Sequence, residues 1–122
     1  MPEANHEREG KVVKVLSDFK IVVNLGSQHD IGEHDQFIIY ELGEEIFDPD
    51  NRKSLGKVEI VKGIGKVSHV QAAMSTLVSC KTQEVPVEPK SFGLLGSVRY
   101  ETKLLPFDQP AIGDRVRLRR PF

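Results

Sequence analysis

Hydrophobic and polar residues alternate over short stretches along most of this chain, and a period of two is typical of half-buried β-strands. The pattern predicts strands over Lys11–Leu16, Lys20–Leu25, Gln36–Leu42, Leu55–Lys62, Lys66–Val70, Ser75–Thr82 and Arg115–Arg119. Short strands at regular spacing, with no convincing helix, predict an all-β antiparallel barrel or sandwich. We expect a barrel, because closure removes the exposed edges that so short a sheet would otherwise carry.

The segment from Ile46 to Gly56 lies between two of these strands and consists largely of turn-forming residues. Asp48 is expected to accept hydrogen bonds from backbone N–H groups just downstream. Pro49 presets φ for the second turn position, and Asn51 tolerates a left-handed conformation. The strands on either side therefore form a long β-hairpin in this interpretation.

Gly63 and Gly65 flank Ile64 in the extended region that follows the hairpin. Glycine weakens the interior of a strand and often marks a bulge or a tight bend. We expect this pair to bend the sheet so that it can close into a barrel.

The segment from Gln83 to Pro110 is interrupted by prolines and glycines before the last strand begins. Structureless loops beyond about 12–15 residues are uncommon in compact domains, so we expect a functional loop or a hairpin insertion. Its larger apolar residues are Phe92, Leu94, Leu95, Leu104, Leu105 and Phe107. Either they fold back as a lid on the core, or they project and require a protein partner or a second copy of the chain. Phe92, Leu94 and Leu95 are therefore candidate partner-binding residues.

Length and composition are those of one ordinary globular domain. The chain has 122 residues, 39% hydrophobic and 29% charged, with a formal net charge of −1. Residues 1–9 are polar and are expected to be a flexible leader, with the domain over residues 10–122. No apolar run approaches the roughly 18 residues of a membrane span, and the N-terminus has no signal-peptide core. These features predict a cytoplasmic protein, and the net charge indicates no strong bias toward nucleic acid.

Candidate chemistry is sparse. His29, Asp30, His34 and Asp35 could bind a divalent cation, or they could be turn residues and solvated histidines. Cys80 is the only cysteine, so no intramolecular disulfide is possible, and we expect it to be a buried or half-buried apolar residue. Neither a Gly-x-Ser-x-Gly nor a His-Glu-x-x-His motif occurs. We therefore expect no enzyme activity and no cofactor.

The last strand carries the strongest candidate binding residues. Arg115, Arg117 and Arg119 share one face at a spacing of two, and guanidinium groups bind carboxylates and phosphates bidentately. The row could contact an acidic protein, or it could bind nucleic acid, as small barrels do. It could also be a solvated face that protects a sheet edge. The absence of Trp and the presence of only two Tyr leave little for base stacking.

Several motifs in order resemble the C-terminal domain of flagellar assembly protein T. The residues that carry the resemblance are Gly10, Val12, Val22, Asn24, Gly26, Asp35, Phe37, Tyr40, Asp48, Pro49, Leu55, Gly56, Gly113 and Asp114. They span nearly the whole chain. His34 and Arg52 stand where the family pattern usually has glycine.

The resemblance implies a small β-barrel, of SH3-like or OB-like size, that acts by contacting other proteins. It implies no catalytic residues. In that bacterial family the domain belongs to a periplasmic assembly around the flagellar motor, so a periplasmic location is the alternative to a cytoplasmic one. The resulting prediction is a non-enzymatic protein-interaction or assembly module. The alternative is a small nucleic-acid-binding barrel that uses the last strand.

Overall fold

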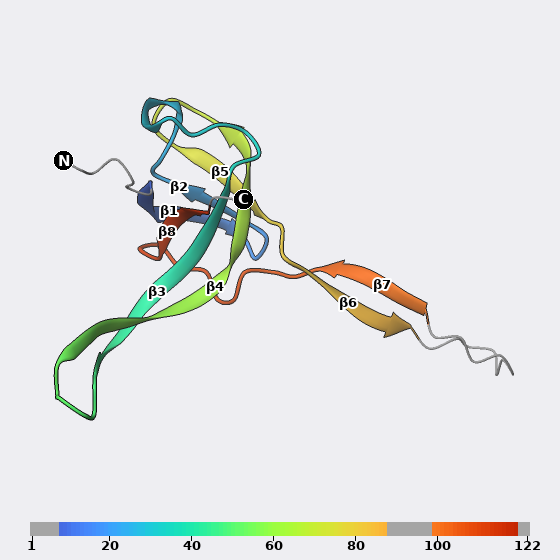
Figure 1. The fold of residues 1–122 in the computed structure, drawn as a ribbon. Helices are drawn as coiled ribbons and strands as arrows, with labels where there is room; N and C mark the ends of the chain where they lie inside the picture. Colours follow the sequence, from blue (N-terminus) through green and yellow to red (C-terminus); the bar gives the residue numbers. More distant parts are fainter. Residues whose placement is uncertain (1–7, 88–98, 120–122) are drawn as a thin grey trace, which may run out of the picture.

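The strands in this computed structural model, which describes residues 8–87 and 99–119, form a closed barrel and a separate two-stranded sheet (Figure 1). The strands are β1 (Glu9–Ser17), β2 (Lys20–Val23), β3 (Gln36–Phe47), β4 (Ser54–Val70), β5 (Ser75–Ser79), β6 (Thr82–Val87), β7 (Arg99–Leu104) and β8 (Arg115–Arg119). The predicted all-β fold and barrel closure are confirmed.

Barrel closure depends on β8, which pairs antiparallel with β1 on one side and with β3 on the other. The complete order around the barrel is β1-β2-β5-β4-β3-β8. A 3₁₀ helix over Ser27–His29 follows β2. The described residues include no helix long and apolar enough to cross a membrane.

The core lies inside the barrel and is built from alternate strand positions. Its buried strand residues are Val12, Ile21, Val23, Phe37, Ile39, Val67, Leu77, Val116 and Leu118. Phe107, from the loop before β8, joins this cluster and is only 2% exposed. One apolar residue of the 83–110 segment therefore folds back on the core.

Gly63 makes room for Phe107 and marks an irregularity in β4. A Cβ atom at Gly63 would lie 2.8 Å from Phe107 Cδ1, closer than carbon atoms can approach without movement. The pairing with β3 shifts register here, since Ile39 opposes Gly63 while Tyr40 opposes Val61. The predicted bulge is confirmed, and Lys62 is its unpaired residue.

β3 and β4 continue past the barrel as a paired hairpin arm, which we define as residues 41–61 (Figure 1, lower left). The predicted long hairpin is confirmed, and its strands extend further than expected, to Phe47 and from Ser54. The turn is closed by a 2.8 Å hydrogen bond from Asp48 N to Lys53 O.

Side chains in the hairpin turn behave largely as expected. Asp48 Oδ1 accepts a 2.8 Å hydrogen bond from Asp50 N, as predicted. The left-handed residue is Arg52, with φ of 65°, and not Asn51. Asn51 instead uses its side-chain oxygen to accept a 2.9 Å hydrogen bond from Lys53 N. Asn51 therefore contributes to the turn through its side chain, while Arg52 takes the left-handed position.

Two expected boundaries differ in the structure. β1 begins at Glu9, and Arg8 is already tied to the barrel by a 3.0 Å ion pair with Asp30. The strand predicted over Ser75–Thr82 is broken after Ser79. Cys80 N donates a 2.9 Å hydrogen bond to Ile64 O, and the chain then leaves the barrel to start β6.

The described part of the 83–110 segment contributes to the second sheet. β6 and β7 pair antiparallel from Thr82 and Leu104 to Val87 and Arg99, and they extend away from the barrel (Figure 1, right). Leu104 is 47% exposed, in contrast to buried Phe107. The segment thus combines a projecting strand pair with a loop that packs on the core.

Candidate functional site

The three arginines of β8 lie on the outside of the barrel. The burial of this strand alternates, with Val116 and Leu118 buried and Arg115 and Arg119 exposed. Because β8 pairs on both sides, the row cannot protect a sheet edge, so that interpretation is wrong. Lys11 of β1 lies on the same outer face, and we call Lys11, Arg115, Arg117 and Arg119 the cationic face.

Arg117 is held by neighbours on two strands. Its two terminal nitrogens donate to the Glu59 carboxylate at 3.0 and 3.1 Å, a bidentate ion pair. Its Cζ atom lies 4.9 Å from the centre of the Tyr40 ring, within the range of a cation–π contact. Hydrogen bonds from Arg117 lower the pKa of Glu59 from its ordinary value, although partial burial opposes this. Arg117 therefore contributes structure as well as charge.

Arg115 and Lys11 occupy directly opposite positions on neighbouring strands β8 and β1. Like charges placed opposite each other across two strands are destabilising. Both residues are exposed, and in residues 8–87 and 99–119 neither forms an ion pair with an acidic side chain. Within the described residues, the barrel thus holds two facing cations together with no ion pair to either of them.

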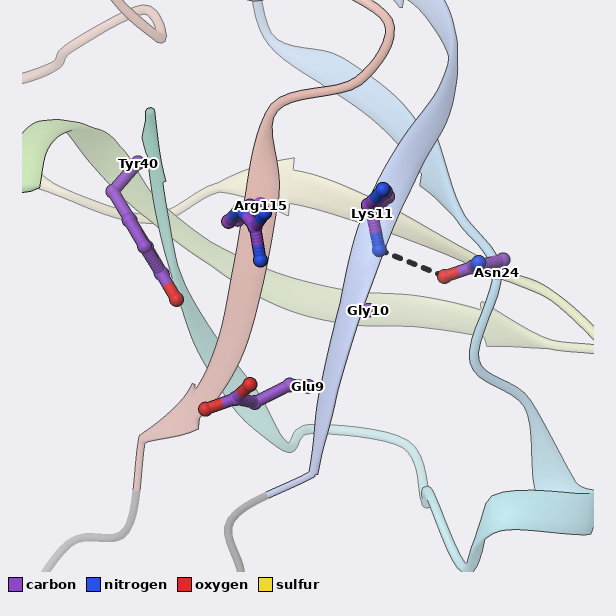
Figure 2. A pocket seen from close by; sticks show the side chains of 6 residues that line it. All are labelled: Glu9, Gly10, Lys11, Asn24, Tyr40 and Arg115. Carbon is purple, nitrogen blue, oxygen red and sulfur yellow. Dashed lines mark hydrogen bonds between the residues drawn. The ribbon is translucent and has the colours of Figure 1, made fainter. Parts of the chain in front are cut away.

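A pocket of about 350 Å³ opens beside this pair. Its lining residues are Glu9, Gly10, Lys11, Asn24, Tyr40 and Arg115. Figure 2 shows Arg115 and Lys11 side by side on their strands, between Tyr40 and Asn24, with Glu9 below them. The pocket therefore combines two cations, a phenol, an amide and one carboxylate.

Asn24 and Gly10 shape the β1 side of the pocket. Asn24 Oδ1 accepts a 2.8 Å hydrogen bond from Lys11 N, which fixes the amide next to β1 (Figure 2). A Cβ atom at Gly10 would lie 2.5 Å from Asn24 Oδ1 and 2.8 Å from Leu25 Cγ. Only glycine fits at this position without displacing Asn24, so the sequence requires glycine here for close approach.

Three of the four residues that could have bound a metal, His29, Asp30 and Asp35, use their side chains in hydrogen bonds or an ion pair within the chain. His29 Nδ1 accepts a 3.0 Å hydrogen bond from Gly26 N, and Asp35 Oδ2 accepts one of 2.9 Å from Gly32 N. Asp30 pairs with Arg8, and His34 adopts a left-handed φ of 77°. No group of three or more potential metal ligands occurs within the described ranges.

Cys80 is half-buried just after β5, beside a second pocket of about 480 Å³ that also includes His34, Lys66 and Leu104. Burial raises the pKa of the Cys80 thiol, against the smaller opposing effects of Lys66 and Arg119. A raised pKa reduces the thiolate fraction, which is the nucleophilic form. Cys80 therefore has the character expected of a packing residue.

The candidate partner-binding residues Phe92, Leu94 and Leu95 lie outside the described residues. Conversely, sequence reasoning missed Lys11, Asn24 and Tyr40 as members of the same site as Arg115. Lys11 and Arg115 are more than a hundred positions apart in the chain. The expected closure of the barrel could have identified Lys11 as a neighbour of Arg115, because closure places the last strand beside the first.

Comparison of the sequence with models of known protein families and with curated proteins found no match.

Proposed function

We propose that this protein is a non-enzymatic interaction module that binds an acidic segment of a partner protein through the cationic face. The observation that supports this proposal is the pair of facing cations, Lys11 and Arg115, which form no ion pair with an acidic side chain in the described ranges. A bound carboxylate would remove their mutual repulsion. The exposed Arg119 extends the positive surface along the same strand.

Binding of nucleic acid through the last strand is the alternative function. Base stacking needs an accessible aromatic ring, but Tyr40 is only 4% exposed and lies beneath Arg117. Arg117 is also committed to Glu59. Both observations favour the acidic protein, which needs charge and hydrogen-bond donors but no stacking surface.

The likeness to the C-terminal domain of flagellar assembly protein T agrees with a role in assembly. We extend the proposal to such a role, in which the acidic partner is another protein of the same assembly. The choice of an acidic partner does not depend on that likeness, because it comes from the charges on β1 and β8.

The test compares two triple variants that lose the same charge at different places. In the first, Lys11, Arg115 and Arg119 become Gln; in the second, the exposed Lys53, Lys57 and Lys103 become Gln. Fluorescence anisotropy with a labelled hexaglutamate peptide should show at least about a tenfold weaker affinity for the first variant. The second should stay within about twofold of the wild-type protein, because exposed distant charges contribute little.

Single-stranded DNA of matched charge serves as the competing probe. The proposal predicts tighter binding of the peptide than of the DNA. Equal losses of peptide affinity in both triple variants would contradict a specific cationic face, and stronger binding of DNA would replace the proposal by its alternative.

A further inference from the structure

The pocket beside Lys11 and Arg115 is lined mostly by hydrogen-bond donors. Lys11 and Arg115 supply charged N–H groups, and Tyr40 and Asn24 supply a hydroxyl and an amide. Asn24 uses its side-chain oxygen to hold Lys11 N, so its amide nitrogen is left over as a donor. Across residues 8–87 and 99–119, none of these four side-chain donors is used in a hydrogen bond or an ion pair.

The charge of the lining indicates which kind of anion fits. Lys11 and Arg115 contribute two positive charges, and the one carboxylate in the lining, that of Glu9, removes one of them. Glu9 opposes Arg117 in the β1–β8 register and pairs with no described cation. The remaining charge of +1 matches a monoanion. A phosphate dianion would bring a second negative charge toward Glu9.

We propose that this pocket is a carboxylate-binding subsite, which takes one acidic side chain or the C-terminal carboxylate of a partner polypeptide. The planar guanidinium of Arg115 matches a carboxylate bidentately, and Lys11 adds a point charge from the opposite strand. Tyr40 and Asn24 supply the neutral donors at its two sides. The subsite rests on the proposed function, and it specifies which part of the cationic face determines specificity.

The subsite also accounts for two unfavourable features of the unbound barrel. Facing cations destabilise a strand pair. A glycine within a strand, as Gly10 is in β1, weakens that strand. Natural proteins retain such local conflicts mainly where function needs them. Neutral substitutions at Lys11 or Arg115 should therefore leave the melting temperature unchanged or raise it while they weaken binding.

Single substitutions in the full chain test the subsite with the hexaglutamate peptide as probe. Lys11→Gln and Arg115→Gln should each weaken binding by about tenfold, the scale of one lost charge-assisted contact. The matched control Lys14→Gln, an exposed β1 residue outside both the cationic face and the pocket lining, should weaken it by no more than about twofold. Arg119→Gln, on the cationic face but outside the pocket lining, should weaken binding less than either pocket variant. Glu9→Gln should strengthen binding, because it removes the one negative charge in the lining.

Arg115→Lys is the second variant at the central position. This variant keeps the positive charge but loses the planar guanidinium that can bind a carboxylate bidentately. Its affinity for the peptide should therefore fall between those of the wild-type protein and Arg115→Gln. Melting temperatures show that each variant is folded. Competition by acetate and by inorganic phosphate at equal ionic strength distinguishes the two anion chemistries, and acetate should displace the peptide at the lower concentration.

The possible failures separate the subsite from the proposed function. Equal weakening by the pocket variants and by Arg119→Gln, with Lys14→Gln unchanged, would overturn the subsite and leave the acidic partner. Preferential displacement by phosphate would overturn the assignment to a carboxylate. A wild-type protein that does not bind the peptide at all would overturn both proposals.

Discussion

The barrel half and the arm half of the β3–β4 hairpin both contain large apolar residues among polar ones, but these residues lie in opposite environments. Within the barrel, Phe37 and Ile39 are fully buried at alternate positions. In the hairpin arm the same two strands remain paired, but their large apolar side chains are all more than a third exposed. These arm residues are Leu42, Ile46, Phe47, Leu55, Val58, Ile60 and Val61.

Strand pairing and burial are therefore separate consequences of the same pattern. Alternation and β-branched residues specify an extended backbone that pairs with its neighbour, and this holds along the whole hairpin. Burial needs a second layer, which the barrel supplies through the opposite wall and through Phe107. Figure 1 shows that the arm extends beyond that wall.

Two phenylalanines of β3 should show the largest difference in stability cost between the barrel and the arm. Phe37 is 0% exposed in the barrel, and Phe47 is 54% exposed in the arm. Replacing Phe37 with Ala should lower the free energy of unfolding by about 3–5 kcal/mol, through lost burial and a cavity. The same change at Phe47 should cost about 0.5 kcal/mol, as surface substitutions do. Urea unfolding of both variants measures the contrast, and similar losses would mean that the arm is packed as part of the core.

Two lysines of β4, Lys62 at the junction of barrel and arm and Lys57 in the arm, should show a smaller difference in stability cost. Lys62 Nζ lies 2.9 Å from Asp114 Oδ2 and 2.9 Å from Glu41 Oε1, and its side chain is 9% exposed. Lys62→Met leaves the nearly buried Asp114 without its cation, which should cost about 2–4 kcal/mol. Lys57→Met in the exposed arm should cost less than about 1 kcal/mol. Thermal or urea unfolding of the two variants measures the difference, and equal costs would contradict the structural role of Lys62.

The stabilisation by Lys62 should also depend on pH, in a direction that its pKa determines. Burial alone would lower the pKa of Lys62, but its hydrogen bonds to Glu41 and Asp114 raise the pKa above the ordinary value. The ammonium group therefore stabilises the fold fully below its unfolded pKa of about 10.4, and this stabilisation is lost as the pH rises through the folded pKa. Urea unfolding across that range should show a wild-type advantage over Lys62→Met that shrinks at alkaline pH. A constant advantage would contradict the role of the ammonium charge.

The sequence predicted local elements of this fold better than their extents. Alternation identified every barrel strand, and the turn residues around Asp48 located the hairpin. Gly63 indicated the bulge, because glycine within a strand often marks a bulge or a tight bend. The break after Ser79 was missed, because it depends on where Cys80 and Leu105 find backbone partners in other parts of the chain.

The candidate site was only half predictable. The spacing of Arg115, Arg117 and Arg119 places them on one face without any tertiary information. Two further facts require the closed barrel: Lys11 faces Arg115, and Arg117 is engaged by Glu59 and Tyr40. Sequence periodicity describes one strand at a time, whereas this site is formed across β1, β3 and β8.

The proposed binding site is tested most directly by a map of where an acidic peptide contacts the folded protein. Amide chemical shifts of the ¹⁵N-labelled chain can be followed during titration with hexaglutamate. We expect the largest shifts at residues 9–11, Asn24, Tyr40 and Arg115, with little change in the hairpin arm. Shifts concentrated in the exposed apolar residues of the arm, with none around Arg115, would contradict the cationic face as the binding site.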